Sequence, residues 1–561
     1  MRSLCKIIVF ALLVNFGIAA GARSDDSDTS TGKAASRAQA VTEHIFLQES
    51  KLVESMRGYT PLVETYIQRL KPDNDLWTVP DKDRYFLGRL ILDETALNGQ
   101  AFKDHNQLRF FSRVLDRLDS FYRINYSHIG FLETVFLKDH FDQEHYNLKY
   151  IRQQFLGEVR TLVFDVTPKN PQGLEMRFMG RIWVEDQDDN IVRINGTYGP
   201  NTESQYYFHF DSWRINMQPG VWLPAYVYTE ESDAQQFDSF RKLAMKGQTR
   251  LWGYDLKHSG RQSEFTNVQV EADDVSDKSS RGANEISPVQ SQHLWEREAE
   301  DNVLDRMERA GILAPEGEVS KVLQTVVNNL EITNNLNIDP EVRCRVLLTT
   351  PLESFAIGNT IVISRGLLDV LPDEASLAMV LSRELGHIAL GHRMNTKYAF
   401  SDRMLFPDEQ VFLDIDMLQS EQDEQAADQK GLELLKNSPY KDKLAGAGLF
   451  LSVLADRAPG LAWLVSPHFG NRYAKKSPIR LAALAQAPAL EVRNLAQVPA
   501  LPLGSRIKLD PWDDHIEMLK SKPVALRSAR DKMSFEVTPM YPNLVNFNAP
   551  AAKEVAAQPP Q

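Results

Sequence analysis

The stretch that most constrains this chain is VLSRELGHIALGH, at residues 380–392. In the pattern HExxH, two histidines four residues apart lie on one face of a helix and bind Zn²⁺, while the glutamate acts as general base on the metal-bound water. Glu384 and His387 fit this pattern, but Arg383 stands at the position of the first histidine. A guanidinium has no lone pair to donate, and its charge repels a dication. The motif therefore keeps its general base and one ligand and lacks the other ligand.

A helix is predicted around this motif. Asp373 is a suitable N-cap after Pro372, and the apolar residues that follow recur three and four positions apart, as they do on one buried helix face. Arg383 and His387 share another face at i, i+4. The alternative is a core helix with an incidental histidine, because the substitution already removes one of the two histidine ligands on which the motif depends.

A second amphipathic helix is predicted at residues 421–435, EQDEQAADQKGLELL. Glu424 and Asp428 lie one turn apart on it. Many zinc hydrolases take their third ligand from a carboxylate on a downstream helix, and a further acid can orient a ligating imidazole by a hydrogen bond. The two carboxylates therefore match what the altered motif would need from elsewhere in the chain.

Over residues 290–490 the chain resembles the HtpX-like and BepA-like zinc metalloendopeptidases, which are gluzincins related to the CAAX prenyl proteases. The segments that carry the resemblance are SFA at 354–356, GNTIVISRGLL at 358–368, RELGHIALGH at 383–392 and EQAAD at 424–428. The resemblance implies Glu384 as general base and Asp428 as the supporting acid of the catalytic site, with His387 and Glu424 as zinc ligands. It also implies a mainly helical domain with a small sheet, and polypeptide substrates.

Two further histidines are candidates for the missing ligand. His392 follows His387 by five residues, about 140° round a continuous helix, so it is expected to point away and to be structural. His468 would reach the site only through tertiary folding, and the alternative for it is a solvated surface group. The family also has a His-Pro pair before its closing helix, where this chain has Ser477 and Pro478.

The N-terminus has the features of a secretory signal peptide. Arg2 and Lys6 precede an apolar run at residues 7–20, which ends in small residues typical of a cleavage site. The run is shorter than the ~20 residues that a membrane-spanning helix needs. We therefore expect removal of residues 1–22, no transmembrane anchor after processing, and a periplasmic or secreted protein.

Charge and cysteine content exclude some classes of partner and fold. The formal net charge is −13 and becomes −15 without Arg2 and Lys6, which argues against nucleic acid and anionic lipid as bulk partners. Cys5 leaves with the signal peptide, so Cys344 remains alone and no internal disulfide is expected.

Composition and periodicity divide the rest of the chain into regions that together predict an α+β fold. We expect a disordered linker at residues 23–40, a mostly helical region at 41–145 and an antiparallel, curved β-sheet domain at 146–268. A polar linker at 269–292 would lead to the metallopeptidase-like domain at 293–490. Recurrent prolines predict an extended C-terminal arm at residues 491–561.

The predicted β domain resembles the LolA-type lipoprotein carriers. The phrases that carry this resemblance are GRIWVED at 180–186, IVR at 191–193 and WLP at 222–224. It implies an open half-barrel that can cradle a lipid or acyl chain. The alternative is a plain scaffold whose aromatic residues fill its own core.

Two functions are therefore considered. In the first, the metallopeptidase-like domain is impaired or inactive and acts by binding proteins in envelope assembly or quality control. In the second, the chain is an active zinc metalloendopeptidase with Glu384 as base and a substitute ligand. Arg383 favours the first, since even outer-shell changes cost a zinc site ~10–100-fold in affinity. We expect its guanidinium to hold the carboxylate of Glu424 by two hydrogen bonds, so that a salt bridge replaces zinc as the link between the two helices.

Overall fold

The computed structural model describes most of the chain between residues 27 and 546. The described residues are 27–73, 77–92, 97–101, 131–137, 141–170, 177–198, 209–231, 244–254, 288–392, 419–467, 469–470, 477–491, 507–510, 515–518, 535–536, 544 and 546. The predicted signal peptide and all of the predicted linker before residue 288 lie outside them, as does His468.

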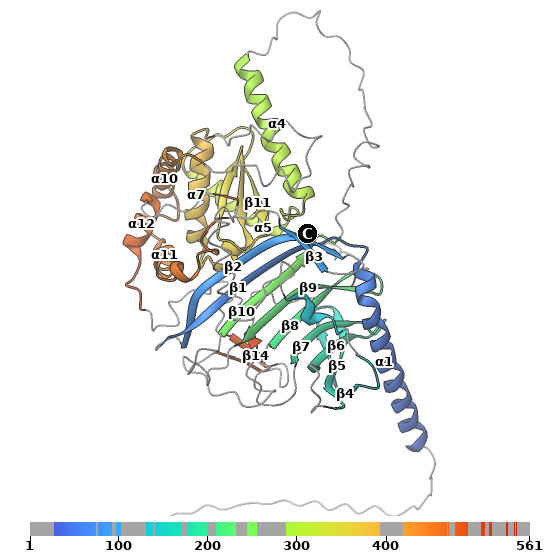
Figure 1. The fold of residues 1–561 in the computed structure, drawn as a ribbon. Helices are drawn as coiled ribbons and strands as arrows, with labels where there is room; N and C mark the ends of the chain where they lie inside the picture. The colour runs from blue at the N-terminus through green and yellow to red at the C-terminus, as the bar shows by residue number, and fades with distance from the viewer. Residues whose placement is uncertain are drawn as a thin grey trace, which may run out of the picture.

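A curved, ten-stranded sheet dominates the first half of the molecule (Figure 1). Its spatial order is β3-β2-β1-β10-β9-β8-β7-β6-β5-β4, and the registers of neighbouring strands are antiparallel. The strands are β1 (Leu62–Asp73), β2 (Trp77–Leu92), β3 (Leu97–Ala101), β4 (Tyr146–Leu156), β5 (Val159–Pro168), β6 (Phe178–Glu185), β7 (Ile191–Tyr198), β8 (His209–Gln218), β9 (Val221–Glu231) and β10 (Ala244–Trp252). The antiparallel, curved sheet expected from the sequence is confirmed.

The expectation of a mostly helical region at residues 41–145 is wrong for β1, β2 and β3. In β1, Leu62 and Tyr66 are buried on one face and Val63 and Ile67 on the other. A spacing of four residues is even, so it puts side chains on one face of a strand as well as of a helix. Since β1 is buried on both faces, it also lacks the alternation that distinguishes a strand.

The disordered linker expected at residues 23–40 is also contradicted, because helix α1 (Ser27–Met56) begins within it. α1 packs on one face of the sheet, where Ile45, Phe46 and Met56 join the core together with the short helix η2 (Leu132–Val135). Glu49 of α1 accepts two hydrogen bonds of 2.8 Å from Arg214 of β8. A buried ion pair and an apolar face therefore hold the helix to the sheet.

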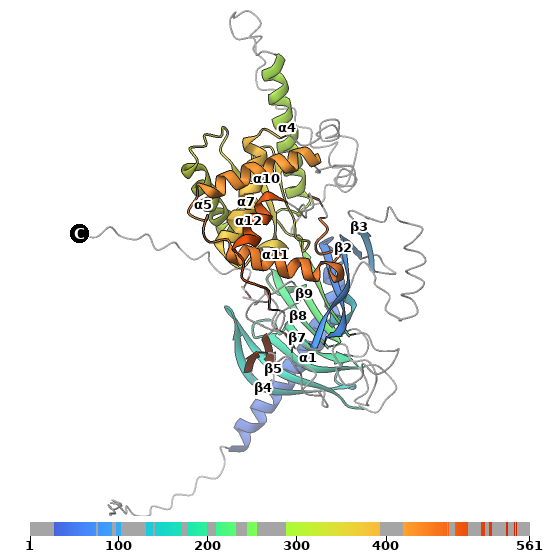
Figure 2. The same ribbon diagram turned by 90° about the vertical axis from the view of Figure 1, so that its left-hand side faces the viewer.

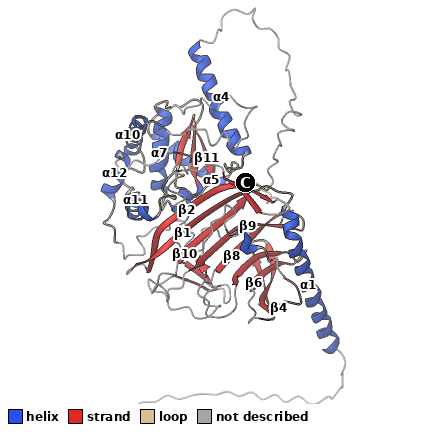
Figure 3. Cartoon of the chain, in the orientation of Figure 1, coloured by secondary structure: helices blue, strands red, loops and turns tan. Residues whose placement is uncertain are grey.

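The second half of the molecule is mainly helical, with a small sheet of order β11-β13-β12 (Figure 3). Its elements are α4 (Pro288–Arg309), α5 (Glu318–Thr333), β11 (Arg343–Leu347), β12 (Ser354–Ile357), β13 (Thr360–Ser364), α6 (Arg365–Val370), α7 (Glu374–Ala389), α10 (Glu421–Lys436), α11 (Ala445–Arg457), η4 (Ala458–Gly460) and α12 (Pro478–Gln486). β11 is parallel to β13, and β12 is antiparallel to it. The predicted α+β class is therefore confirmed.

The predicted C-terminal arm contains short strands in its described part. β14 (Ile507–Asp510) pairs with β15 (His515–Met518) and with β16 (Phe535–Glu536). Among the described helices, none combines the length and the apolar character that crossing a membrane requires.

The helical region lies over β1, β2 and β10 on the face of the sheet opposite α1 (Figures 1 and 2). Leu62, Tyr66 and Tyr85 of the sheet belong to the same hydrophobic cluster as the buried residues of α5 and α7. Trp252 of β10 donates a hydrogen bond of 2.7 Å to the carbonyl of Gly311. The two regions therefore share one continuous core.

Candidate functional site

Helix α7 carries the altered motif through the middle of the helical region. It begins as predicted after Asp373, whose side chain accepts a hydrogen bond of 2.7 Å from the backbone N–H of Ser376. Every residue from Ala375 to Ile388 is buried, because α7 packs against α5, α10 and the small sheet. Arg383 and Glu384 are therefore held in the core rather than at an open surface.

Helix α10 is predicted correctly and lies directly against α7. Ser420 caps it by accepting a hydrogen bond from the N–H of Asp423. Two glycines permit the close approach of the helices. A Cβ atom at Gly386 would lie 2.5 Å from the carbonyl oxygen of Ala427, and one at Gly431 would lie 2.8 Å from that of Ser382. This contact brings the carboxylates of α10 to Arg383.

Arg383 contacts three carboxylates. Its Nη1 lies 3.1 Å from Oε1 of Glu384, its Nε lies 3.1 Å from Oδ1 of Asp428, and its Nη2 forms an ion pair with Oε2 of Glu424. The predicted pair with Glu424 is present, but the guanidinium divides its donors among three acids instead of holding one with two bonds. We call these four residues the Arg383 cluster. All four are buried, with Arg383 3%, Glu384 2% and Asp428 1% exposed.

The cluster places more negative than positive charge in the core. Burial raises the pKa of Glu384, and Arg383 and a hydrogen bond of 2.7 Å from Oγ of Ser354 oppose the rise. Burial also raises the pKa of Asp428, against the lowering effects of Arg383 and of a hydrogen bond from Ser477. Arg383 is thus a charged group that opposes the effect of burial on the pKa of both carboxyls.

His387 lies beside the cluster as a neutral imidazole. Its Nε2 is 3.5 Å from Oε1 of Glu424, and its Nδ1 is 3.0 Å from Nδ1 of His392. Burial first, and then the charge of Arg383, lowers the pKa of His387 to about 3. The expectation that His392 points away is wrong, because α7 ends at Ala389 and Gly391, at φ +70°, turns the chain back.

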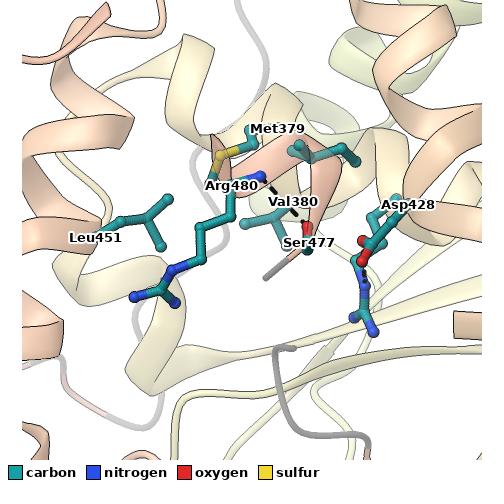
Figure 4. Close-up of a pocket in the computed structure, with 8 residues that line it drawn as sticks. Met379, Val380, Asp428, Leu451, Ser477 and Arg480 are labelled. Atoms are coloured by element: carbon teal, nitrogen blue, oxygen red, sulfur yellow. Dashed lines mark hydrogen bonds and ion pairs between the residues drawn. The ribbon is translucent and has the colours of Figure 1, made fainter. Parts of the chain in front are cut away.

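Ser477 joins the cluster from α12, of which it is the N-cap (Figure 4). Its side chain accepts a hydrogen bond from the N–H of Arg480 and bonds to Asp428. A cavity of about 20 Å³ lies here, with room for about one water molecule. Its lining residues are Met379, Val380, Arg383, Asp428, Leu451, Ser477, Ile479 and Arg480. The two positions where the sequence lacks an expected histidine, 383 and 477, thus meet at one carboxylate.

The described residues of this site do not fit a catalytic zinc ion. His387 and Glu424 are adjacent, but Glu424 is paired with the guanidinium that stands at the position of the first ligand. Within the described ranges, no three His, Cys, Asp or Glu side chains are grouped so that they could hold a metal ion. No sequence motif assigns a role to Ser354, which donates a hydrogen bond to Glu384, the predicted general base.

Residues 314–468 match the sequence model of peptidase family M48, which confirms the predicted relationship for the helical region. The metalloprotease LoiP of Escherichia coli (strain K12) is 33% identical over 94 residues, which cover 16% of this chain and 36% of LoiP. A LolA superfamily protein from Nitrosomonas europaea aligns structurally at 9% identity over 40% of this chain and 95% of that protein, with a TM-score of 0.17.

Proposed function

We propose that this chain, whose residues 314–468 form an M48-type peptidase domain, does not hydrolyse peptides and instead binds polypeptides in envelope assembly or quality control. The observation that carries the proposal is the guanidinium of Arg383 at the first ligand position, paired with Glu424. We further propose that the protein is exported to the periplasm or secreted, on the strength of the signal-like N-terminus.

Peptide hydrolysis by the altered motif would lack its nucleophile. A zinc peptidase uses the metal to generate hydroxide from water at neutral pH, and the glutamate of the motif takes the proton. Here a fixed cation stands in place of one ligand, and Glu384 is engaged by Ser354 and Arg383. A guanidinium offers electrostatic attraction to a carbonyl oxygen, but it cannot supply a metal-bound hydroxide.

Binding of an extended polypeptide needs none of the lost chemistry. β12 is an edge strand of the small sheet and lies against α7. Extended peptides add to sheet edges through main-chain hydrogen bonds, which supply affinity, while pockets for side chains supply specificity. A domain that keeps the strand and loses the metal can therefore still hold a polypeptide.

The test compares the wild type with Arg383→His after dialysis against a chelator and then against zinc. We expect the wild type to retain no zinc and to bind a fluorescent, reduced and unfolded polypeptide without cleaving it. Arg383→His, which restores the ligand pattern, should take up more zinc than the wild type. Stoichiometric zinc in the wild type, with cleavage that a chelator and Glu384→Gln both abolish, would overturn the proposal and favour an active peptidase with a substitute ligand.

A further inference from the structure

We propose that the sheet region holds a loop of the helical region across the free edge of β12, which is the edge that faces away from β13. This loop must therefore move before a partner strand can pair with β12. The loop, which we call the covering loop, comprises the described residues 463–467 and 469–470. The proposal rests on the binding function above and adds its regulation. Without a bound polypeptide, the covering loop occupies the free edge of β12, and the large sheet holds the loop in that position.

The orientation of β12 shows which backbone groups face its free edge. The N–H of Ser364 donates to the carbonyl of Glu353, so Glu353 faces β13, and Phe355 and Ile357 do the same in the antiparallel register. Backbone groups alternate along a strand. Residues 352, 354 and 356 therefore point to the free edge.

The covering loop already uses part of this edge. The N–H of Leu352 donates a hydrogen bond of 2.8 Å to the carbonyl of Leu464. Further along, a Cβ atom at Gly470 would lie 3.0 Å from the carbonyl oxygen of Ser354 and 2.6 Å from the ring of Phe355. A glycine is needed there because the backbone of the loop touches the strand. A partner strand would have to displace both contacts.

Buried carboxylates hold both ends of the covering loop. Glu353 accepts hydrogen bonds of 2.7 and 2.9 Å from the N–H groups of Phe469 and Gly470. At the other end, Asp83 of β2 accepts hydrogen bonds of 2.9 and 2.8 Å from the N–H groups of Trp463 and Leu464. Asp83 belongs to the large sheet, so the position of the loop depends on the sheet region.

The sheet region also fixes the chain that enters β12. Glu64 of β1 accepts hydrogen bonds of 2.7 and 2.8 Å from the N–H and hydroxyl of Thr350. Arg250 of β10 donates both to Glu64 and to the carbonyl of Leu348. At the start of β12, Ser354 in turn donates to Glu384 of the Arg383 cluster. One set of hydrogen bonds thus runs from the large sheet, through the loop and the strand, to the altered site.

Asp83 is the residue whose removal should open the edge. Its loss leaves two backbone N–H groups of the loop without their acceptor, whereas the Glu353 anchor stays in place. Asp81 is a matched control, because it lies on the same strand and forms a more exposed ion pair with Arg69 instead of contacting the covering loop. Asp83→Asn keeps the shape of the side chain but leaves one acceptor oxygen for the N–H groups of Trp463 and Leu464, which bond to different oxygens of Asp83.

The experiment measures amide hydrogen exchange and binding of an unfolded polypeptide in the full-length wild type, Asp83→Ala, Asp83→Asn and Asp81→Ala. We expect Asp83→Ala to speed exchange at Leu352, Trp463 and Leu464 by about tenfold or more relative to α7, because buried N–H groups lose a charged acceptor. Its affinity for the polypeptide should rise, with Asp83→Asn between it and the wild type. Asp81→Ala should match the wild type in both measurements.

Two results would separate the failure of this inference from the failure of the proposed function. If hydrogen exchange at Leu352 and Leu464 stays at the wild-type rate in both Asp83 variants, the large sheet does not hold the covering loop. That result overturns the inference and leaves the proposed binding function unaffected. If exchange rises but no variant binds the polypeptide, the proposed function fails and the edge has no partner to exclude. Should Asp83→Ala also raise exchange throughout α7, Asp83→Asn alone decides the outcome.

Discussion

Removing the Arg383 guanidinium should destabilise the helical region strongly. In Arg383→Ala, Glu384, Glu424 and Asp428 would remain packed together in the core with no cation among them. Breaking one buried ion pair costs about 3–5 kcal/mol, because the remaining charge has lost its partner and is not rehydrated. Three carboxylates depend on this one cation, so we expect a loss near the upper end of that range at neutral pH.

The loss should depend on pH in a defined direction. The pKa values of Glu384 and Asp428 are already raised by burial, so these groups favour the folded state below their unfolded pKa values and cease to do so as pH rises through their folded ones. Arg383 opposes the rise, and its removal raises both folded pKa values further. The deficit of Arg383→Ala relative to the wild type should therefore be smaller at about pH 5 than at about pH 8.

The assay is native-state hydrogen exchange of the amides of α7 and α10, together with urea unfolding, at both pH values. Arg343→Ala is the matched control, since Arg343 forms an exposed pair with Asp301 and its loss should cost less than about 1 kcal/mol. A deficit for Arg383→Ala as small as that of the control, or one of equal size at both pH values, would refute the reasoning.

Three further predictions test the packing and the charge state. Gly386→Ala places a Cβ 2.5 Å from a backbone carbonyl of α10, so the melting temperature should fall, by the equivalent of about 1–3 kcal/mol, whereas Gly58→Ala, with open space around it, should have no such effect. Glu49→Ala leaves Arg214 buried without its carboxylate, so α1 should lose its protection from hydrogen exchange, and retained protection would contradict this. His387, with a pKa of about 3, should keep constant ring NMR shifts between about pH 5 and 8. Because the folded protein favours the neutral ring, His387 contributes its full stabilisation above the ordinary histidine pKa. That contribution declines as pH falls below this value.

The local parts of the site were predictable from the sequence because local signals specify them. The cap at Asp373 and the apolar spacing of α7 agree with each other, and the helix starts where they indicate. The predicted helix at residues 421–435 matches α10 to within one residue. Each helix combines a capping side chain with a periodic apolar face, and both signals act within a few residues.

The errors occur where distant parts of the chain decide the structure. β1 has an even apolar spacing that a helix and a strand share, and its partners, β2 and β10, supply the hydrogen bonds that make it a strand. The expectation for His392 assumes a continuous helix, whereas α7 ends at Ala389 and Gly391 reverses the chain. No signal in the sequence showed that Asp83 would meet the backbone of Leu464, 381 residues away.

The ion pairs of Arg383 link the two helices in a different way from a catalytic zinc ion. In a zinc site, the metal joins the motif helix to the downstream helix, and part of the folding free energy comes from binding it. Here the same two helices are joined by the ion pairs of Arg383 and by close backbone contacts at glycines of both helices. Such pairs form with the chain itself and require no metal supply, but they offer no open coordination position. If the proposed function holds, Arg383 supplies a link between the two helices that is present whenever the chain is folded, as a binding module requires.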